Sequence, residues 1–308
     1  MISLRSLLFI VSLCLGPLAG AQVTNSSMDT EDAFLCTGSP SYESGADLTG
    51  LNFGAAGTLA LAPASSAKGV FESVIMFNLA AGVAQFNAAY GTNHWLITGV
   101  TLSLASNYGQ AGVQPNSPIF NVIAGGQFAI EWLSDSNWVE GTGTPNLPTT
   151  DGVCYDSLPT LLTPPVEILC TNTFVPPGDN VRGLWPLPLS TNLVGNLTNG
   201  GNVSFLFFAA DNQVGYLFNS YKYGRGNEPY LNVVASPLLL ILDGAFTNGV
   251  FQLTGIGGDN GVYNVQTSTN LATTNWVTIG SVTAATNGAI VYDDINAIVP
   301  QRYYRLSQ

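Results

Sequence analysis

Charged residues are scarce in this chain of 308 residues. Lys and Arg number 7 and Asp and Glu number 19, which gives a formal net charge of −12 at pH 7. The shortage of basic residues argues against a nucleic-acid partner, because binding a phosphate backbone needs clustered Lys and Arg side chains. We interpret the acidity as a source of solubility. Calcium binding is the alternative interpretation.

Histidine is almost absent, since His94 is the single one. A catalytic histidine needs an orienting carboxylate and a nucleophile, and no motif identifies either. The sequence has no G-x-S-x-G motif that would mark a serine nucleophile. It also has no C-x-x-C motif and only one histidine, so zinc binding is a poor interpretation. We expect His94 at a loop or strand edge, and we predict neither enzymatic activity nor a cofactor, apart from the calcium alternative.

Cysteine is nearly as rare, with four in the chain, of which Cys14 lies in the apolar N-terminal run. Cys36, Cys154 and Cys170 remain, an odd number that allows one pair. A bond between Cys154 and Cys170 would close a loop of roughly fifteen residues, worth about 3 kcal/mol in the chain-entropy model. It would also order a proline-rich segment, so we predict this pair, although Cys36 can compete for either partner.

Long apolar runs are missing beyond the N-terminus. Residues 1–21 contain Arg5, a short apolar run and Ala19-Gly20-Ala21, which is the pattern of a secretory signal peptide cleaved before Gln22. This run is too short to span a bilayer comfortably, and residues 237–242 look like a buried strand or a linker. We therefore expect a secreted protein, extracellular or at the cell surface, with no membrane span after signal removal.

What the chain has in abundance is Gly, Asn, Thr, Ser and Val, a composition that favours an all-β fold. Residues 70–79 form a uniformly apolar run that predicts a central strand covered on both faces. Residues 95–104 alternate with a period near two, with Leu96, Val100, Leu102 and Leu104 on one face. Further short strands are expected at 30–35, 58–61, 120–123, 127–133, 203–210, 213–219 and 230–234.

These strands predict a jelly-roll-like β-sandwich over residues 29–235, with a long irregular segment from 138 to 182. The composition changes at Ser236-Pro237. Five shorter strands follow, at 251–253, 262–266, 276–279, 289–292 and 303–306. They predict a second, small Ig-like or fibronectin-like β-sandwich over residues 237–308.

Several short motifs occur in a fixed order in the first domain. They are the acidic start at 31–35, Asn52-Phe53-Gly54, the strands at 73–79 and 97–104, Trp138-Val139-Glu140-Gly141 and the closing run at 229–233. In this order they resemble the DNRLRE family, the disaggregatase-related β-sandwich module of secreted bacterial proteins, some members of which are carbohydrate-binding modules. The chain departs from the family at Met76 and Asn78, where relatives often carry charged residues. A charged ligand bound there by relatives is therefore not expected here.

The last domain carries a second resemblance. Residues 261–271, 275–276, Asp293-Asp294 and 302–306 resemble a small C-terminal β-sandwich, common in large secreted bacterial proteins and similar to fibronectin type III in architecture. The resemblance implies an accessory or presentation role and no catalytic residue.

Tyrosines and bases gather at one place, around Tyr221, Lys222, Tyr223 and Arg225. Exposed aromatic rings can stack on sugar rings while polar neighbours hydrogen-bond the hydroxyl groups. Tyr221 and Tyr223 share a face if this segment is a strand. We predict ligand binding by Tyr221, Tyr223 and Arg225, with Trp138 as a further aromatic candidate.

Three acids, Glu131, Asp135 and Glu140, lie near one another in the sequence. They are candidates for a calcium site, for a pair of glycosidase carboxylates about 5–9 Å apart, or for a solvated strand end. Our prediction is a secreted, non-catalytic module that binds an extracellular polysaccharide or cell-surface matrix. The alternatives are a structural or adhesive surface protein without a small-molecule site, and a polysaccharide-active enzyme.

Overall fold

The computed structural model describes residues 22–39, 46–107, 119–224, 226–270, 275–297 and 302–308. The expected signal peptide, residues 1–21, lies outside the described residues, as does Arg225. The chain divides into two compact units. The sheet unit consists of Asn25–Val83 and Gly99–Val233, and the C-terminal unit includes Ala84–Thr98 and Val234–Gln308.

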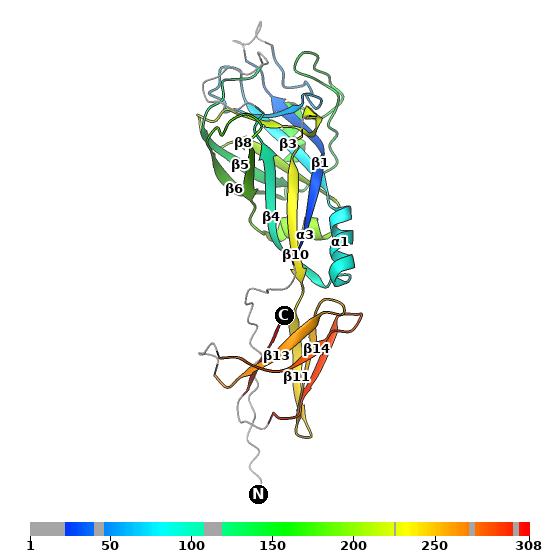
Figure 1. Cartoon of the computed structure of the whole chain (residues 1–308). Coiled ribbons are helices and arrows are strands. Elements are labelled where there is room, and N and C mark those ends of the chain that lie inside the picture. Colours follow the sequence, from blue (N-terminus) through cyan, green and yellow to red (C-terminus); the bar gives the residue numbers. More distant parts are fainter. Residues whose placement is uncertain (1–21, 40–45, 108–118, 225, 271–274, 298–301) are drawn as a thin grey trace. The chain divides into compact units, whose positions relative to one another are not determined.

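Strands dominate the structure, at 49% against 11% for helices, and they form antiparallel sheets, so the predicted all-β class is confirmed (Figure 1). The largest sheet has eight strands in the order β6-β5-β8-β3-β1-β10-β4-β7. They are β1 (Val23–Cys36), β3 (Phe71–Asn78), β4 (Trp95–Ala105), β5 (Gly126–Leu133), β6 (Val166–Phe174), β7 (Arg182–Pro186), β8 (Asn202–Ala209) and β10 (Tyr230–Pro237). A two-stranded sheet is formed by β2 (Thr58–Leu61) and β9 (Tyr216–Asn219).

Strand β3 lies inside the eight-stranded sheet, paired with β1 on one side and β8 on the other. One of its faces packs against β2, where the Ser73 hydroxyl bonds both the N–H and the carbonyl of Ala60. Its other face carries Val74 and Met76, which pack with Leu158 and Leu161 in one core cluster. Each large apolar side chain buried in this way contributes about 1.5–3 kcal/mol. The apolar run at 70–79 is therefore central and covered on both faces, as its sequence predicts.

Strand β4 alternates as expected only after Gly99. Val100, Leu102 and Leu104 are buried, whereas Leu96 is 42% exposed and its neighbours Trp95 and Ile97 are buried instead. The buried face thus changes parity within the strand, which a single period-two pattern does not predict.

Two segments differ from the predicted strands. Residues 120–123 are not a strand, and Ala124 after them forms an isolated bridge to Gly215, the residue before β9. Conversely, β6 and β7 lie in the segment predicted to be irregular, which also contains the 3₁₀ helix η1 (Tyr155–Ser157) and helix α2 (Leu158–Leu161). Polar residues on the exposed face of β6 hide its strand character from an apolar pattern.

Two longer helices, α1 (Ala80–Tyr90) and α3 (Thr191–Thr198), were not predicted. Helix α1 is rich in alanine, the residue of highest helix propensity. Helix α3 begins at Ser190, whose side chain accepts a hydrogen bond from the N–H of Leu193. Its buried residues, Leu193 and Leu197, are one turn apart.

The predicted disulfide between Cys154 and Cys170 is wrong, because Cys36, Cys154 and Cys170 are all free. The pairing of β6 with β5 places Cys170 opposite Ile130, and its sulfur accepts a hydrogen bond from the Asn172 amide. The Cys154 sulfur lies 3.4 Å from the Ser157 hydroxyl. Sheet pairing and the packing of α2 order this segment in place of a cross-link.

The C-terminal unit contains two three-stranded sheets, in the orders β11-β12-β15 and β14-β13-β16. The strands are β11 (Leu240–Thr247), β12 (Val250–Ile256), β13 (Val262–Ser268), β14 (Val277–Thr283), β15 (Ala289–Asp294) and β16 (Tyr303–Ser307). Phe251 of one sheet stacks on Tyr304 of the other, with ring centroids 4.4 Å apart. The two sheets therefore share a core, as in a small β-sandwich. No helix in the described ranges has the length and apolar character needed to cross a membrane.

Candidate functional site

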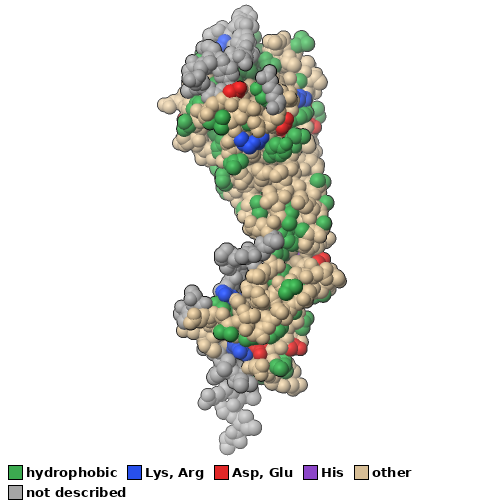
Figure 2. Space-filling model, in the orientation of Figure 1, with side chains coloured by type: hydrophobic (Ala, Val, Ile, Leu, Met, Phe, Trp, Pro, Cys, Tyr) green, Lys and Arg blue, Asp and Glu red, His purple; other side chains and the backbone are tan. Residues whose placement is uncertain are grey.

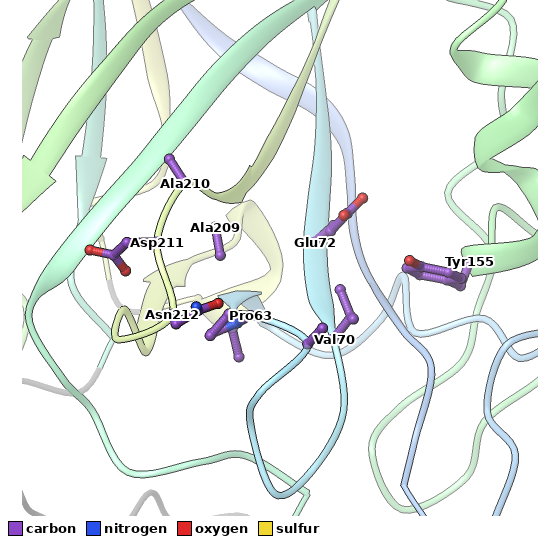
Figure 3. Close-up of a pocket in the computed structure, with 10 residues that line it drawn as sticks. Pro63, Val70, Glu72, Tyr155, Ala209, Ala210, Asp211 and Asn212 are labelled. Atoms are coloured by element: carbon purple, nitrogen blue, oxygen red, sulfur yellow. The ribbon is translucent and has the colours of Figure 1, made fainter.

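A cavity of about 490 Å³ opens on the sheet unit where β3, the β2–β3 turn and the segment after β8 meet (Figure 3). Its lining includes Pro63, Val70, Glu72, Tyr155 and Asn212. We call it the Glu72 pocket. Its volume falls within the range of about 300–1,000 Å³ that is usual for small-ligand sites.

Glu72 is the second residue of β3, where it is flanked by the buried Phe71 and Ser73. It lies on the sheet face that carries Val74. Burial raises the pKa of its carboxyl group to about 7, with repulsion from Glu131 as the second cause. No hydrogen bond of the Glu72 side chain occurs among the described residues. A half-buried acid that titrates near neutrality beside a cavity is typical of a functional site.

Glu131 belongs to β5 and is 9% exposed. It pairs with Leu206 of β8, which in turn pairs with Val74 of β3, so Glu131 and Glu72 share one face of the sheet. Burial raises the pKa of Glu131 as well. The sequence-predicted acid thus lies on the same sheet face as Glu72 but outside the pocket lining, and its charge strengthens the negative potential at Glu72.

Tyr155, the first residue of η1, forms the wall of the pocket opposite Glu72. Its hydroxyl points toward the side of the pocket where Glu72 lies (Figure 3). Burial raises the pKa of this tyrosine, and the charge of Glu72 raises it further.

The segment that precedes Tyr155 is held by Asn52, which is fully buried. The Asn52 amide nitrogen donates to the carbonyls of Glu140 and Val153, and its oxygen accepts the N–H groups of Gly54 and Gly143. A Cβ at Gly143 would lie 1.9 Å from the Asn52 carbonyl oxygen, so only glycine fits there. The wall of the pocket is therefore preorganised.

Asp211 also lines the pocket, but its carboxylate is turned away from Glu72 (Figure 3). It accepts the backbone N–H groups of Gln127, Gln213 and Val214 at 2.6, 2.9 and 2.9 Å. Burial acts to raise the pKa of Asp211, but these donors outweigh it and the pKa is lowered. Asp211 therefore fixes the backbone after β8.

The tyrosine segment singled out in the sequence is a 3₁₀ turn, η2 (Tyr221–Tyr223), and not a strand. Ser220 caps it by accepting the N–H of Lys222, and Gly224 ends it with a φ of 67°. The prediction that Tyr221 and Tyr223 share a strand face is wrong for this reason.

Tyr221 and Lys222 instead surround the buried Glu140. Its Oε2 atom accepts the Tyr221 hydroxyl at 2.9 Å and forms an ion pair with Lys222. Its Oε1 atom accepts the N–H of Asp32 at 3.1 Å, and Asp32 accepts the N–H of Tyr221 at 3.0 Å. We call this group the Glu140 anchor.

The anchor contains Asp32, and a further acid, Asp29, lies beside it. Burial raises the pKa of Asp32 to about 6 and that of Asp29 to about 11. The Asp29 carboxyl oxygens have no hydrogen-bond partner among the described residues, although Asp32 is close enough to raise the Asp29 pKa further. Burial raises the pKa of Tyr221, and its hydrogen bond to Glu140 adds to the effect. The anchor ties η2 to β1 through the bonds of Glu140 and Asp32.

The remaining predicted site residues are not brought together. Asp135 accepts the N–H of Asn137 in a loop. Within the described ranges no group of three acidic, histidine or cysteine side chains is placed to hold a metal, so Glu131, Asp135 and Glu140 form no such set. Trp138 is 8% exposed and packs in the core, where its indole N–H donates to Ser204.

His94 does have a carboxylate partner, which the sequence did not reveal. Its Nδ1 atom lies 2.6 Å from an oxygen of Asp259, and both residues belong to the C-terminal unit. A Cβ at Gly91 would lie 2.3 Å from Asp259, and one at Gly288 would lie 2.8 Å from the imidazole. The surroundings of this pair are therefore tightly packed.

No family model matches the sequence, and no curated protein matches it. Among solved structures, a β-glucuronidase from Ruminococcus gnavus is similar at 9% identity and a TM-score of 0.21, over 99% of this chain and 43% of that chain. The same enzyme in complex with uronic isofagomine gives a TM-score of 0.23 at 9% identity, over 97% and 45%. An allantoicase gives 0.18 at 10% identity, over 76% and 77%. The chain spans less than half the length of these glucuronidase chains, and TM-scores this low carry no argument.

Proposed function

We propose that this chain is a secreted, non-catalytic carbohydrate-binding protein of the DNRLRE type, whose glycan ligand occupies the Glu72 pocket. The observation that supports this proposal is the pocket itself. It combines an open cavity, an aromatic wall at Tyr155 and a carboxyl group without a hydrogen-bond partner in the described structure.

The chemistry of the lining suits a sugar. A tyrosine ring presents an apolar face on which a pyranose can stack, and its hydroxyl group can bond a sugar hydroxyl. Glu72 accepts hydrogen bonds when ionised and donates one when protonated. The side-chain amide of Asn212 adds a donor and an acceptor at the rim.

Binding is favoured over hydrolysis by the state of the second carboxylate. Hydrolysis by a pair of acids needs both of them on the cleft, about 5–9.5 Å apart. Asp211 is committed to three backbone N–H groups. Glu131 is buried and is not part of the pocket lining. Among the described lining residues, Glu72 is thus the acid that remains available.

A glycan array probed with residues 22–308, with and without calcium, tests the proposal. We expect binding to one polysaccharide class, loss of that binding in Tyr155→Ala, and retention in the control Tyr223→Ala. A blank array with folded protein would overturn the proposal in favour of a structural or adhesive role. Loss in Tyr223→Ala alone would move the site to the tyrosine segment.

A further inference from the structure

We propose that the Glu72 pocket selects a cationic glycan, one that carries free amino groups, over neutral and anionic glycans. This inference rests on the proposed function and names the ligand class for the same site.

The charged side chains that line the pocket are all of one sign. Glu72 and Asp211 are the charged side chains of the described lining, which contains neither Lys nor Arg. Glu131, outside the lining, adds a third carboxyl group whose charge acts on Glu72. On the face of the molecule shown in Figure 2, charged side chains of either sign are few and scattered. Within the described lining, no basic side chain offsets the charge of Glu72.

The two walls of the pocket suit an amino sugar in particular. An ammonium group has three N–H donors and no acceptor, and Glu72 offers carboxylate oxygens that no described donor occupies. A charge-assisted hydrogen bond of this kind is stronger than a bond between neutral groups. Tyr155 can contact the sugar ring while the ammonium group reaches Glu72, because the two side chains approach the cavity from opposite sides.

Selection against anionic glycans follows from the same geometry. The carboxylate of a uronic acid would add a like charge beside Glu72 and Glu131, which already repel each other. Like charges brought together in a partly desolvated site disfavour the wrong ligand. A neutral glycan meets neither this repulsion nor the ammonium–carboxylate attraction, so we expect it to bind with intermediate affinity.

The protonation of Glu72 adds a second signature. The titratable groups that act on it are Glu131 from β5 and Tyr155 from η1, whereas the Asp211 carboxylate in the same lining is turned away from it. Because the pKa of Glu72 is about 7, the carboxyl group is mostly protonated at pH 5 and loses its attraction for an ammonium group. For a glycan whose ammonium groups stay protonated over this range, the preference should therefore weaken from pH 7 to pH 5.

Calorimetric titration with three oligosaccharides of equal length tests the inference, namely oligomers of glucosamine, N-acetylglucosamine and galacturonic acid. We expect the glucosamine oligomer to bind about tenfold more tightly than the N-acetylated one, the equivalent of about 1.4 kcal/mol. Glu72→Gln should abolish this preference and leave the binding of the neutral oligomer in place. The control Glu167→Gln removes an equal charge on β6, outside the pocket, and should keep the preference.

Each other outcome is decisive. Equal binding of the neutral and cationic oligomers would overturn the inference and leave the proposed function standing. A preference that persists in Glu72→Gln, or that falls equally in Glu167→Gln, would show attraction to the net charge and would also overturn it. No binding of any oligomer by the folded chain, checked by circular dichroism, would count against the proposed function itself.

Discussion

Glu72 and Glu140 are two acids of the same sheet unit in opposite situations. The carboxylate of Glu140 is surrounded by the Asp32 N–H, the Tyr221 hydroxyl and the Lys222 ammonium group. That of Glu72 has no hydrogen-bond partner among the described residues and borders an open cavity. Both are withdrawn from water, but only one is compensated by the protein.

The difference teaches which acid is available for a ligand. A buried carboxylate with a full set of donors is a structural element, since its bonds offset the cost of desolvation. A carboxylate that is desolvated without hydrogen-bond donors has a raised pKa, as Glu72 does. A bound ligand can supply the donors that the protein does not provide. We therefore assign anchoring to Glu140 and propose recognition for Glu72.

Asn52 supports both regions, so its loss should have the largest effect. In Asn52→Ala, the carbonyls of Glu140 and Val153 and the N–H groups of Gly54 and Gly143 lose their side-chain partner. At about 1 kcal/mol or more for each buried group left unpaired, we expect the free energy of unfolding to fall by about 4 kcal/mol. Urea denaturation measures this loss.

Asn52→Asp is the matched control, because it keeps the acceptor for the two glycine N–H groups and removes the two donors. We expect it to be at least as destabilising as Asn52→Ala, because it places a buried carboxylate oxygen against the carbonyls of Glu140 and Val153. A loss below about 1 kcal/mol in Asn52→Ala would contradict the role of this residue as the common support.

The clearest test of the comparison is the same substitution at both acids. Glu140→Gln removes the charge that holds Lys222, whose side chain is 30% exposed and can recover some solvation. We expect a loss of about 2 kcal/mol in the free energy of unfolding at pH 8, as for a hydrogen bond to a charged group. Glu72→Gln should instead raise this free energy by about 1 kcal/mol at pH 8, because it removes an uncompensated buried charge.

The gain in Glu72→Gln should depend on pH in a defined direction. The folded-state pKa of Glu72, about 7, lies above the ordinary value of 4.5. Its stabilising proton is therefore fully present below pH 4.5 and is lost as the pH rises through 7. Denaturation curves at pH 5 should show little difference between the two chains, and those at pH 8 the full gain. A gain larger at pH 5 than at pH 8 would reverse our assignment.

Part of this molecule was predictable from local sequence. The apolar run of β3 and the short strand β2, whose bounds match the expected 58–61, depend on neighbouring residues alone. The pocket was not predictable in this way, because Glu72, Glu131 and Tyr155 come from three separate elements. One indication was present, namely a glutamate in an otherwise apolar central strand. A carboxyl group in such a place either has a hydrogen-bond partner within the protein or is a candidate for ligand binding.

The strand expected for the tyrosine segment was wrong for a local reason. Alternating tyrosines suggested a strand, but Ser220 and Gly224 bracket the three residues as a cap and a left-handed end. The partner of the Tyr221 hydroxyl, Glu140, lies 81 residues away, so the sequence gives no sign that this group is already engaged.

Tyr221→Phe should have the smallest effect and separates the two regions most cleanly. It removes the hydroxyl that donates to Glu140 and leaves the ring and the Lys222 ion pair in place. We expect a loss of about 1 kcal/mol in the free energy of unfolding, the usual value of one hydrogen bond, and unchanged glycan affinity.

Tyr155→Phe is the matched comparison, since its hydroxyl has no hydrogen bond among the described residues, and it should change glycan affinity with little effect on stability. If Tyr221→Phe weakened glycan binding more than Tyr155→Phe, the ligand would bind at the Glu140 anchor and not in the Glu72 pocket.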